Sequence, residues 1–227
     1  MAYRCFLLVG GACLAAGLAA CAHGSGAPLS KGQPEAPPTL ACLPEVAPGG
    51  PADTRRTHQG LLIAKEALDD GLPAPPSDRS YSAMQGWMKS EVAHWIAARA
   101  GAVSELKFQL GFDGGASASE QVVGKAAVGL LQEHTALDLQ KIPPPAELAA
   151  EPEIAEMFQE VVAAQAEPFL GAALIAFREC ADAAYEGPDA TAHFAEFCDA
   201  RFRRLRTEVE GRQHARLHPG AHIPAQP

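Results

Sequence analysis

The sequence predicts an all-α fold, a helical bundle or an irregular array of helical hairpins, which follows a disordered tether rich in proline and glycine. Beyond Thr54, apolar residues recur at the three- and four-residue spacing of an α-helix. Clusters of proline and glycine separate these periodic stretches, as expected of turns between helices. Residues 106–112 also alternate like a strand, but a lone strand has no partner elsewhere in the chain, so we expect helix there as well.

The first two predicted helices begin at residues that cap helices and end at residues that break them. Asp53 or Thr54 caps a short helix, which ends at Gly71 and the prolines behind it. Asp78 or Ser80 caps a long helix. The apolar stripe of this long helix consists of Tyr81, Met84, Met88, Val92, Ile96, Ala100, Val103, Leu106 and Leu110.

Further helices follow up to the end of a domain that we place at residues 55–211. Ser117 and Glu120 form a capping-box pattern, in which each side chain bonds to the backbone N–H of the other. Pro168 lies at a kink or in the first turn of a new helix, and residues 187–189 form the last turn. The apolar positions of these helices are Val123, Ala127, Leu130, Leu131 and His134; Ile154, Met157, Phe158 and Val161; Leu170, Ala173, Phe177, Cys180 and Ala184; and Phe194, Phe197, Cys198, Phe202, Leu205 and Val209. We expect residues 212–227 to be a frayed tail.

The two cysteines of the domain are predicted to form a disulfide across the last helical hairpin. Cys180 precedes the turn at Pro188 and Cys198 follows it at a nearly equal distance, and such positions face each other in an antiparallel hairpin. The bond would stabilise the fold by roughly 3 kcal/mol in the chain-entropy account. The alternative is a pair of small apolar thiols buried in the core.

The first residues have the pattern of a secretory signal. Arg4 supplies a positive charge, and an apolar run from Cys5 to Leu18 follows it. This run is shorter than the roughly 20 apolar residues that a membrane-spanning helix needs. It ends in Leu18-Ala19-Ala20-Cys21, which resembles the lipobox of bacterial lipoproteins.

This resemblance implies a signal peptide over residues 1–20 that is cleaved before Cys21, and a lipid anchor on that cysteine. In lipoproteins the thiol receives a diacylglycerol and the new amine is usually acylated, for which palmitate is the chain we expect. Two or three chains hold a protein to a membrane far better than one. Ala22 favours the outer membrane, facing the periplasm, because Asp at this position retains lipoproteins of enteric-type bacteria in the inner membrane. The alternative is an ordinary cleaved signal, with Cys21 as an incidental thiol.

Residues 21–54 are predicted to be a lipidated flexible tether. Its many prolines prevent helix formation, and it has few large apolar residues that could drive folding. A tether of this composition could hold the domain up to roughly 100 Å from the membrane. Cys42 lies on this tether, as the odd thiol left over when Cys21 is acylated and the domain cysteines pair.

Charge and cysteine content exclude some classes of function. The formal net charge is −9, and phosphate contacts need lysine and arginine, so we expect no nucleic-acid partner. An acidic chain is also a poor electrostatic match for a membrane surface, so lipid must provide the anchoring. The cysteines fit an oxidising compartment such as the periplasm, where disulfides persist.

The motifs of known chemistry are incomplete. Gly124-Lys125 lacks the upstream glycine and the following serine or threonine of a phosphate loop. Glu91 and His94 have the Glu-x-x-His spacing of helical di-metal sites, but those sites use two such motifs with two further carboxylates. The reversed spacing recurs in His193-Phe194-Ala195-Glu196. We therefore assign no catalytic residue, no metal ligand and no cofactor.

The sequence allows two roles each for His134 and for two charged stretches. His134 lies on an apolar face, as a hydrogen-bonded core histidine or as part of an enzyme site with a glutamate brought near by folding. An acidic stretch comprises Glu147, Glu151, Glu153, Glu156, Glu160 and Glu167, and a basic final helix has Arg201, Arg203, Arg204, Arg206, Arg212 and Arg216. These stretches pair within the chain and face solvent, or they form a surface for an acidic partner.

The sequence thus predicts a lipid-anchored periplasmic helical protein that binds a protein partner or assists envelope assembly. Helical hairpins in series resemble tetratricopeptide-like folds in architecture, although the chain has no clear repeat of that period. The alternatives are an envelope enzyme, hydrolytic or metal-dependent, that uses His134, and a purely structural spacer. We consider an enzyme the less favoured reading.

Overall fold

A computed structural model describes residue 43 and residues 55–110, 115–187 and 189–217 of the chain. The predictions for Cys21, for Cys42 and for the signal peptide lie outside these residues. Of the predicted tether they include only Leu43, which is half-buried and packs against the core. Helices and no strands form the described part, which confirms the predicted all-α fold. In chain order they are α2 (Arg55–Asp69), α3 (Tyr81–Trp87), the π-helical η3 (Met88–Val92), α4 (Ala93–Gln109), α5 (Ala118–Leu139), α6 (Ala146–Ala149), α7 (Pro152–Glu186), the short η4 (Asp189–Thr191) and α8 (Ala192–Leu217).

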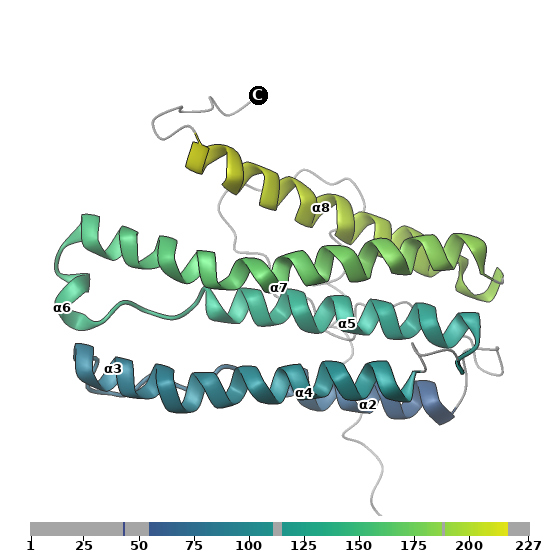
Figure 1. Cartoon of the computed structure of the whole chain (residues 1–227), viewed down its shortest axis with the longest axis horizontal. Coiled ribbons are helices and arrows are strands. Elements are labelled where there is room, and N and C mark those ends of the chain that lie inside the picture. Colours follow the sequence, from purple (N-terminus) through teal and green to yellow (C-terminus); the bar gives the residue numbers. More distant parts are fainter. Residues whose placement is uncertain (1–42, 44–54, 111–114, 188, 218–227) are drawn as a thin grey trace, which may run out of the picture.

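The helices are arranged around α5, which lies in the middle of the bundle (Figure 1). The neighbouring helices α2 and α4 pack against one side of α5, and α7 packs along the other side. Helix α8 turns back after η4 and packs mainly on α7, with a smaller contact to α5. The bundle therefore buries α5 from several directions, and most of its residues are buried.

The predicted long helix of the N-terminal half is nearly continuous but changes type within its length. Ser80 caps α3, because its hydroxyl accepts a hydrogen bond from the backbone N–H of Ala83. One turn of π-helix, η3, then joins α3 to α4, and helix continues to Gln109, over the first four residues of the stretch that alternates like a strand. Tyr81 is 54% exposed, so it does not belong to the buried stripe in which we expected it.

The start of α5 follows the predicted capping box. The Ser117 hydroxyl accepts from the backbone N–H of Glu120, and the Glu120 carboxylate accepts from the backbone N–H of Ser117. On the opposite side of this helix, Gly129 faces the ring of Phe177 on α7 so closely that a Cβ atom there would lie 2.7 Å from Cε1 of the ring. A glycine at this position lets α5 and α7 approach each other.

Helix α7 corrects two expectations. It runs without interruption through Pro168, so the alternative of a new helix starting there is wrong. Met157 and Val161 are 64% and 60% exposed, so they lie outside the core in which the predicted stripe would have placed them. The buried residues of this segment are Val162 and Ala166 instead. The reason is that α7 is apolar on more than one face, so the spacing of its apolar residues does not identify the buried one.

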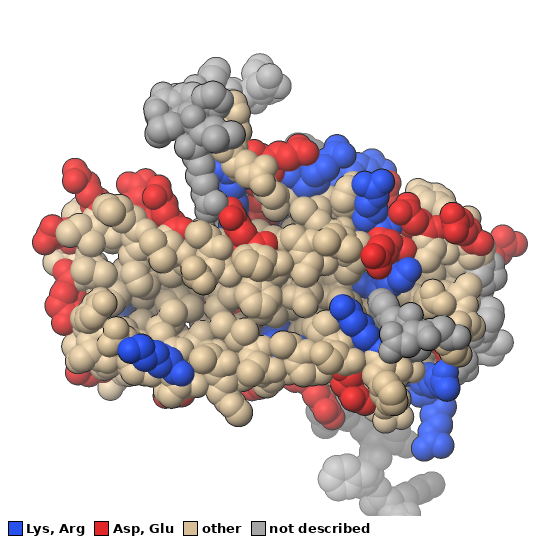
Figure 2. Space-filling model, in the orientation of Figure 1, with Lys and Arg blue, Asp and Glu red and all other residues tan. Residues whose placement is uncertain are grey.

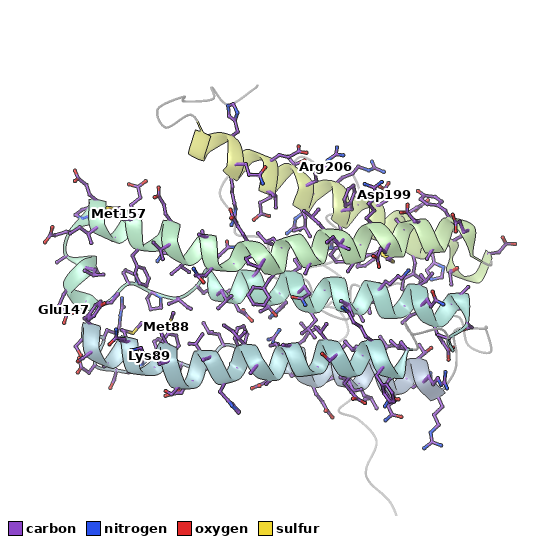
Figure 3. The ribbon with its side chains drawn as sticks, viewed as in Figure 1. Met88, Lys89, Glu147, Met157, Asp199 and Arg206 are labelled. Carbon is purple, nitrogen blue, oxygen red and sulfur yellow. A yellow bond between two sulfur atoms is a disulfide. The ribbon has the colours of Figure 1, made fainter. Side chains whose placement is uncertain are left out.

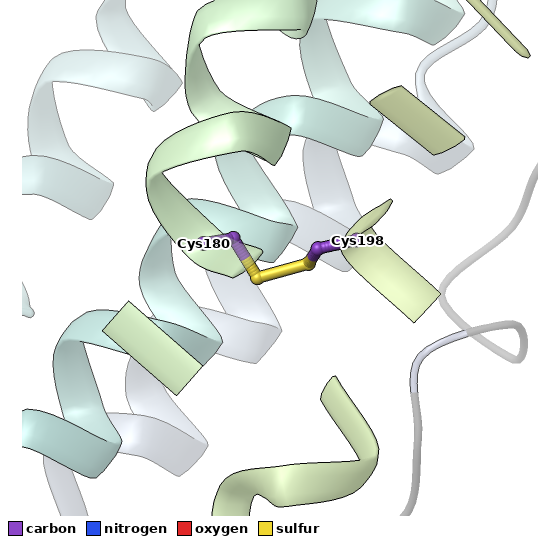
Figure 4. Close-up of a disulfide and its surroundings, with 2 residues drawn as sticks. All are labelled: Cys180 and Cys198. Atoms are coloured by element: carbon purple, nitrogen blue, oxygen red, sulfur yellow. A yellow bond between two sulfur atoms is a disulfide. The ribbon is translucent and has the colours of Figure 1, made fainter. Parts of the chain in front are cut away.

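The last hairpin agrees with the cysteine argument. The sulfur atoms of Cys180 on α7 and Cys198 on α8 lie 2.05 Å apart, at disulfide distance, with 6.0 Å between the two Cα atoms (Figure 4). Both residues are fully buried. Helix α8 continues to Leu217, so it extends into the segment that we expected to be the frayed tail. Arg212 connects this extension to α5, where its guanidinium donates to Gln140 Oε1 at 3.0 Å.

Candidate functional site

Helix α5 buries the carboxylate of Glu120 in its capping box and those of Glu133 and Asp138 further along the helix. Glu133 is 0% exposed, and its Oε1 atom lies 3.5 Å from a guanidinium nitrogen of Arg201 and 3.5 Å from one of Arg204, both on α8. Breaking a buried ion pair leaves a desolvated charge and is strongly unfavourable. The contacts of Glu133 therefore specify how α8 lies across α5.

Asp138, the penultimate residue of α5, is the centre of a second buried cluster. His134 Nδ1 lies 2.9 Å from its Oδ2 atom, Lys141 donates to its Oδ1 atom at 2.7 Å, and Arg99 Nη2 lies 3.5 Å from Oδ2. Burial by itself would raise the pKa of the Asp138 carboxyl, but the close contacts with His134 and Lys141 outweigh burial. The pKa of Asp138 is consequently held below its usual value, and the group is a carboxylate at neutral pH.

Arg99 connects this cluster to α2 and α4. Its Nη2 atom donates to the carbonyl of Asp70 at 3.0 Å, and Trp95 Nε1 donates to the same carbonyl at 2.9 Å. The guanidinium also stacks on the Trp95 ring, 4.7 Å from the ring centroid. Burial lowers the pKa of Arg99, while the charges of Asp138 and Asp70 act in the opposite direction. An arginine remains protonated under these conditions, so Arg99 is a permanent cation. It donates to the carbonyl of Asp70, the residue directly after α2.

A small pocket lies between α2 and α4 beside Arg99. Its volume is about 240 Å³, and it is lined by Ile63, Glu66, Ala67, Asp70, Ala98, Arg99 and Ala102. This volume is below the roughly 300–1,000 Å³ of typical small-molecule sites. The lining does not include His134 or Asp138, so this pocket and the histidine are separate features joined only through Arg99.

His134 is therefore a histidine of the polar core, with Asp138 as its partner. Its side chain is 12% exposed, and the carboxylate that it contacts is also bonded by Lys141 and approached by Arg99. A histidine oriented by an aspartate is half of an acid–base arrangement, which also needs a nucleophile or substrate within reach. Among the described residues, the contacts of His134 bring it an orienting carboxylate and no glutamate.

The other sequence candidates lie on the surface. Glu91 and His94 are both exposed, as are His193 and Glu196, so neither pair points into a common interior site. Within the described residues, no group of three or more histidine, cysteine, aspartate or glutamate side chains is placed to hold a metal ion.

The basic final helix is paired within the chain. Arg203 pairs with Asp199, Arg206 with Glu210 and Arg212 with Glu208, each one turn apart on α8. Figure 3 shows Asp199 and Arg206 on the outer side of this helix. Together with the contacts of Arg201 and Arg204 to Glu133, these pairs give each α8 arginine with a described side chain an acidic partner. Pairing within the chain thus accounts for the described part of this basic stretch, while the side chain of Arg216 lies outside it.

The exposed face of α7 carries large apolar side chains that the bundle does not cover. Met157, Val161 and Ile175 are 64%, 60% and 62% exposed. They lie opposite the residues through which α7 packs on α5 and α8, and Figure 3 shows Met157 on the side of α7 turned away from α5. A Cβ atom built on Gly171, in the same face, would meet no other atom within 4 Å. We call this surface the α7 face and define it by Met157, Val161, Ala164, Pro168, Gly171 and Ile175.

Acidic residues border the α7 face. Figure 2 shows acidic side chains gathered at the end of the molecule where α7 begins, beside a broad uncharged surface. Along α7 the one basic residue is Arg178, which lies 3.9 Å from Asp182. The other charged positions of the helix are Glu153, Glu156, Glu160, Glu167, Glu179, Asp182 and Glu186. The sequence revealed the acidic stretch but not the apolar face beside it.

By length and composition α7 could cross a membrane, and it alone among the described helices meets that criterion. Core helices of soluble proteins meet it too, so this is weak evidence of a membrane span. In the most apolar window of α7, 33% of the residues are buried in the bundle. No family model matches the chain, and neither a curated protein nor a solved structure is a significant match.

Proposed function

We propose that this chain is a lipid-anchored protein-binding module of a bacterial envelope, and that the α7 face is its binding surface. The observation that carries the proposal is the exposure of Met157, Val161 and Ile175 along one side of a helix whose other side forms the core. Soluble proteins rarely leave contiguous apolar patches bare, and such patches commonly mark sites of interaction.

The anchor in this proposal comes from the Leu18-Ala19-Ala20-Cys21 pattern. A tether over residues 21–54 would let the domain meet its partner at a distance from the membrane. The periplasm is the compartment that suits both a lipidated cysteine and a disulfide between Cys180 and Cys198.

The test is site-specific photo-crosslinking in cells. A photoreactive residue at Met157 should give a discrete adduct with another protein, and the substitutions Val161→Asp and Ile175→Asp should together abolish it. The matched control position is Phe108 on α4, an apolar side chain that is 72% exposed but lies outside the α7 face. A photoreactive residue there should give no such adduct. Absence of any adduct from Met157, or an adduct that survives both substitutions, would contradict the proposal.

A further inference from the structure

The apolar residues of the α7 face follow the spacing by which helices pack side by side. Met157, Val161, Ala164, Pro168, Gly171 and Ile175 are separated alternately by four and three residues. This alternation keeps the stripe on one side of the helix over several turns and is the pattern of helix–helix seams. From Met157 to Ile175 the stripe is roughly 27 Å long at about 1.5 Å per residue, which suits a partner helix of similar length.

The middle of the stripe admits a close neighbour. Ala164 and Gly171 are small, and the space beside Gly171 is open. Glycine inside a helix costs about 1 kcal/mol relative to alanine, and none of the described residues packs where the missing side chain would be. The large side chains of Met157, Val161 and Ile175 lie on either side of these small positions. A second helix could therefore pack closely at the small residues and contact the large ones at both ends.

The charged residues around the α7 face indicate the charge of its partner. Glu153, Glu160 and Glu167 repeat at heptad spacing along one edge of the stripe, while Glu179, Asp182 and Glu186 follow at its C-terminal end. Glu153, Glu156 and Glu160 are exposed, and none of the described residues forms an ion pair with them. The single cation, Arg178, is already beside Asp182. The apolar stripe thus has negative charge along one edge and at its C-terminal end.

From this arrangement we infer that the partner at the α7 face contributes a basic amphipathic helix, with apolar residues at four–three spacing and lysine or arginine along its flanks. The inference rests on the proposed function and names the chemistry of its partner. In a dimer of the chain, the acidic residues beside one α7 face would repel those beside the other. A membrane with anionic headgroups would meet the same repulsion. A helix packed against the apolar stripe, with its cations opposite the carboxylates, matches both the apolar residues and the negative charge of the surface.

The test uses the full-length chain and three fluorescent synthetic peptides, followed by fluorescence anisotropy. The first peptide has leucine and alanine at four–three spacing with lysine flanks, the second replaces lysine by glutamate, and the third scrambles the first. The lysine-flanked peptide should bind at least about tenfold more tightly than the other two. The Val161→Asp and Ile175→Asp double variant should weaken that binding by at least about tenfold, whereas Phe108→Asp should leave it unchanged.

A second pair of variants isolates the contribution of charge. Glu156→Gln with Glu160→Gln should weaken binding of the lysine-flanked peptide and reduce its dependence on salt. The control, Glu91→Gln with Glu105→Gln, removes two exposed carboxylates from the other side of the bundle and should do neither. Equal binding of the glutamate-flanked peptide, or equal effects of the two charge variants, would overturn the inference.

Two further outcomes would identify another occupant and also overturn the inference. One is a dimer of the chain, seen by sedimentation at the assay concentration, that Val161→Asp and Ile175→Asp dissociate. The other is flotation of the unlipidated chain with phosphatidylcholine vesicles that depends on the same residues. The in-cell adduct from Met157 separates these results from the proposed function. If the adduct persists while the peptides fail, the partner is a protein of different chemistry, and if the adduct is absent, the proposed function itself fails.

Discussion

Helices α5 and α7 lie side by side in the bundle but distribute polar and apolar residues in opposite ways. The buried helix, α5, carries the fully buried Glu133 and the 4% exposed Asp138. The outer helix, α7, exposes Met157, Val161 and Ile175 to solvent. Both are departures from the usual rule that charges face water and large apolar groups do not. The two helices differ in what accompanies these unusual residues: the buried charges have partners within the chain, whereas the described residues do not cover the exposed apolar groups.

On α5 the buried carboxylates of Glu133 and Asp138 have basic partners within the chain. Arg201 and Arg204 approach Glu133, while Arg99, His134 and Lys141 surround Asp138. On α7 the described part of the chain offers nothing that covers Met157, Val161 or Ile175. The charges of α5 therefore stabilise the arrangement of the helices, and the apolar groups of α7 are available to another molecule. The following predictions test this contrast, in order of decreasing effect.

Removing the carboxylate of Glu133 should have the largest effect. Glu133→Ala leaves Arg201 and Arg204 beside an apolar cavity, and breaking a buried pair costs about 3–5 kcal/mol. We expect a loss near the lower end of this range, because Arg204 is 33% exposed and can be rehydrated. Urea unfolding followed by circular dichroism measures the loss. Glu105→Ala on the exposed side of α4 is the control and should change the unfolding free energy by less than about 0.5 kcal/mol. Similar losses for the two variants would show that Glu133 is not a structural charge.

Two glycines should respond with opposite signs. Gly129→Ala on α5 places a Cβ atom 2.7 Å from the Phe177 ring and should destabilise the fold by about 1–3 kcal/mol through overpacking. Gly171→Ala on α7 meets nothing within 4 Å and should stabilise it by about 1 kcal/mol through helix propensity. Thermal unfolding of both variants provides the comparison. A destabilised Gly171→Ala would mean that the α7 face is packed within this chain.

Asp138 should make stability depend on acidic pH. Its pKa in the folded protein lies below the unfolded value of about 3.9, so its contribution is complete above that value and is lost as the pH falls through the folded pKa. The difference in unfolding free energy between the native chain and Asp138→Asn should be constant above about pH 5. It should shrink as the pH falls below about 4, where Asp138 is protonated first in the unfolded chain and at lower pH in the folded protein. A difference that stays the same across this range would exclude a depressed pKa at Asp138.

Local sequence signals predicted the start of two helices and the turn of the last hairpin. The Ser117–Glu120 box, the Ser80 cap and the turn near Pro188 each depend on neighbours in the chain, and the structure follows them. The pairing of Cys180 with Cys198 could also be predicted, because both residues belong to one hairpin. In each of these cases the interacting residues lie close together in the sequence or flank a single turn.

The buried charges and the exposed apolar face could not be predicted in the same way. A glutamate in a helix ordinarily faces solvent, and only the crossing of α8 over α5 brings Arg201 and Arg204 to Glu133. For α7 the difficulty was reversed. Since apolar residues occur around much of this helix, their spacing allowed Met157 and Val161 to be assigned to the core, although they are exposed. Both features depend on the order in which helices pack, which periodicity does not encode.

The central claim is that the α7 face serves binding and not folding. The most direct measurement compares the Val161→Asp and Ile175→Asp double variant with the native chain in two respects, the free energy of unfolding and the crosslink from Met157 in cells. We predict a change in unfolding free energy of less than about 0.5 kcal/mol, because both side chains are exposed, together with complete loss of the crosslink. A large loss of stability, or a crosslink of undiminished yield, would contradict the claim.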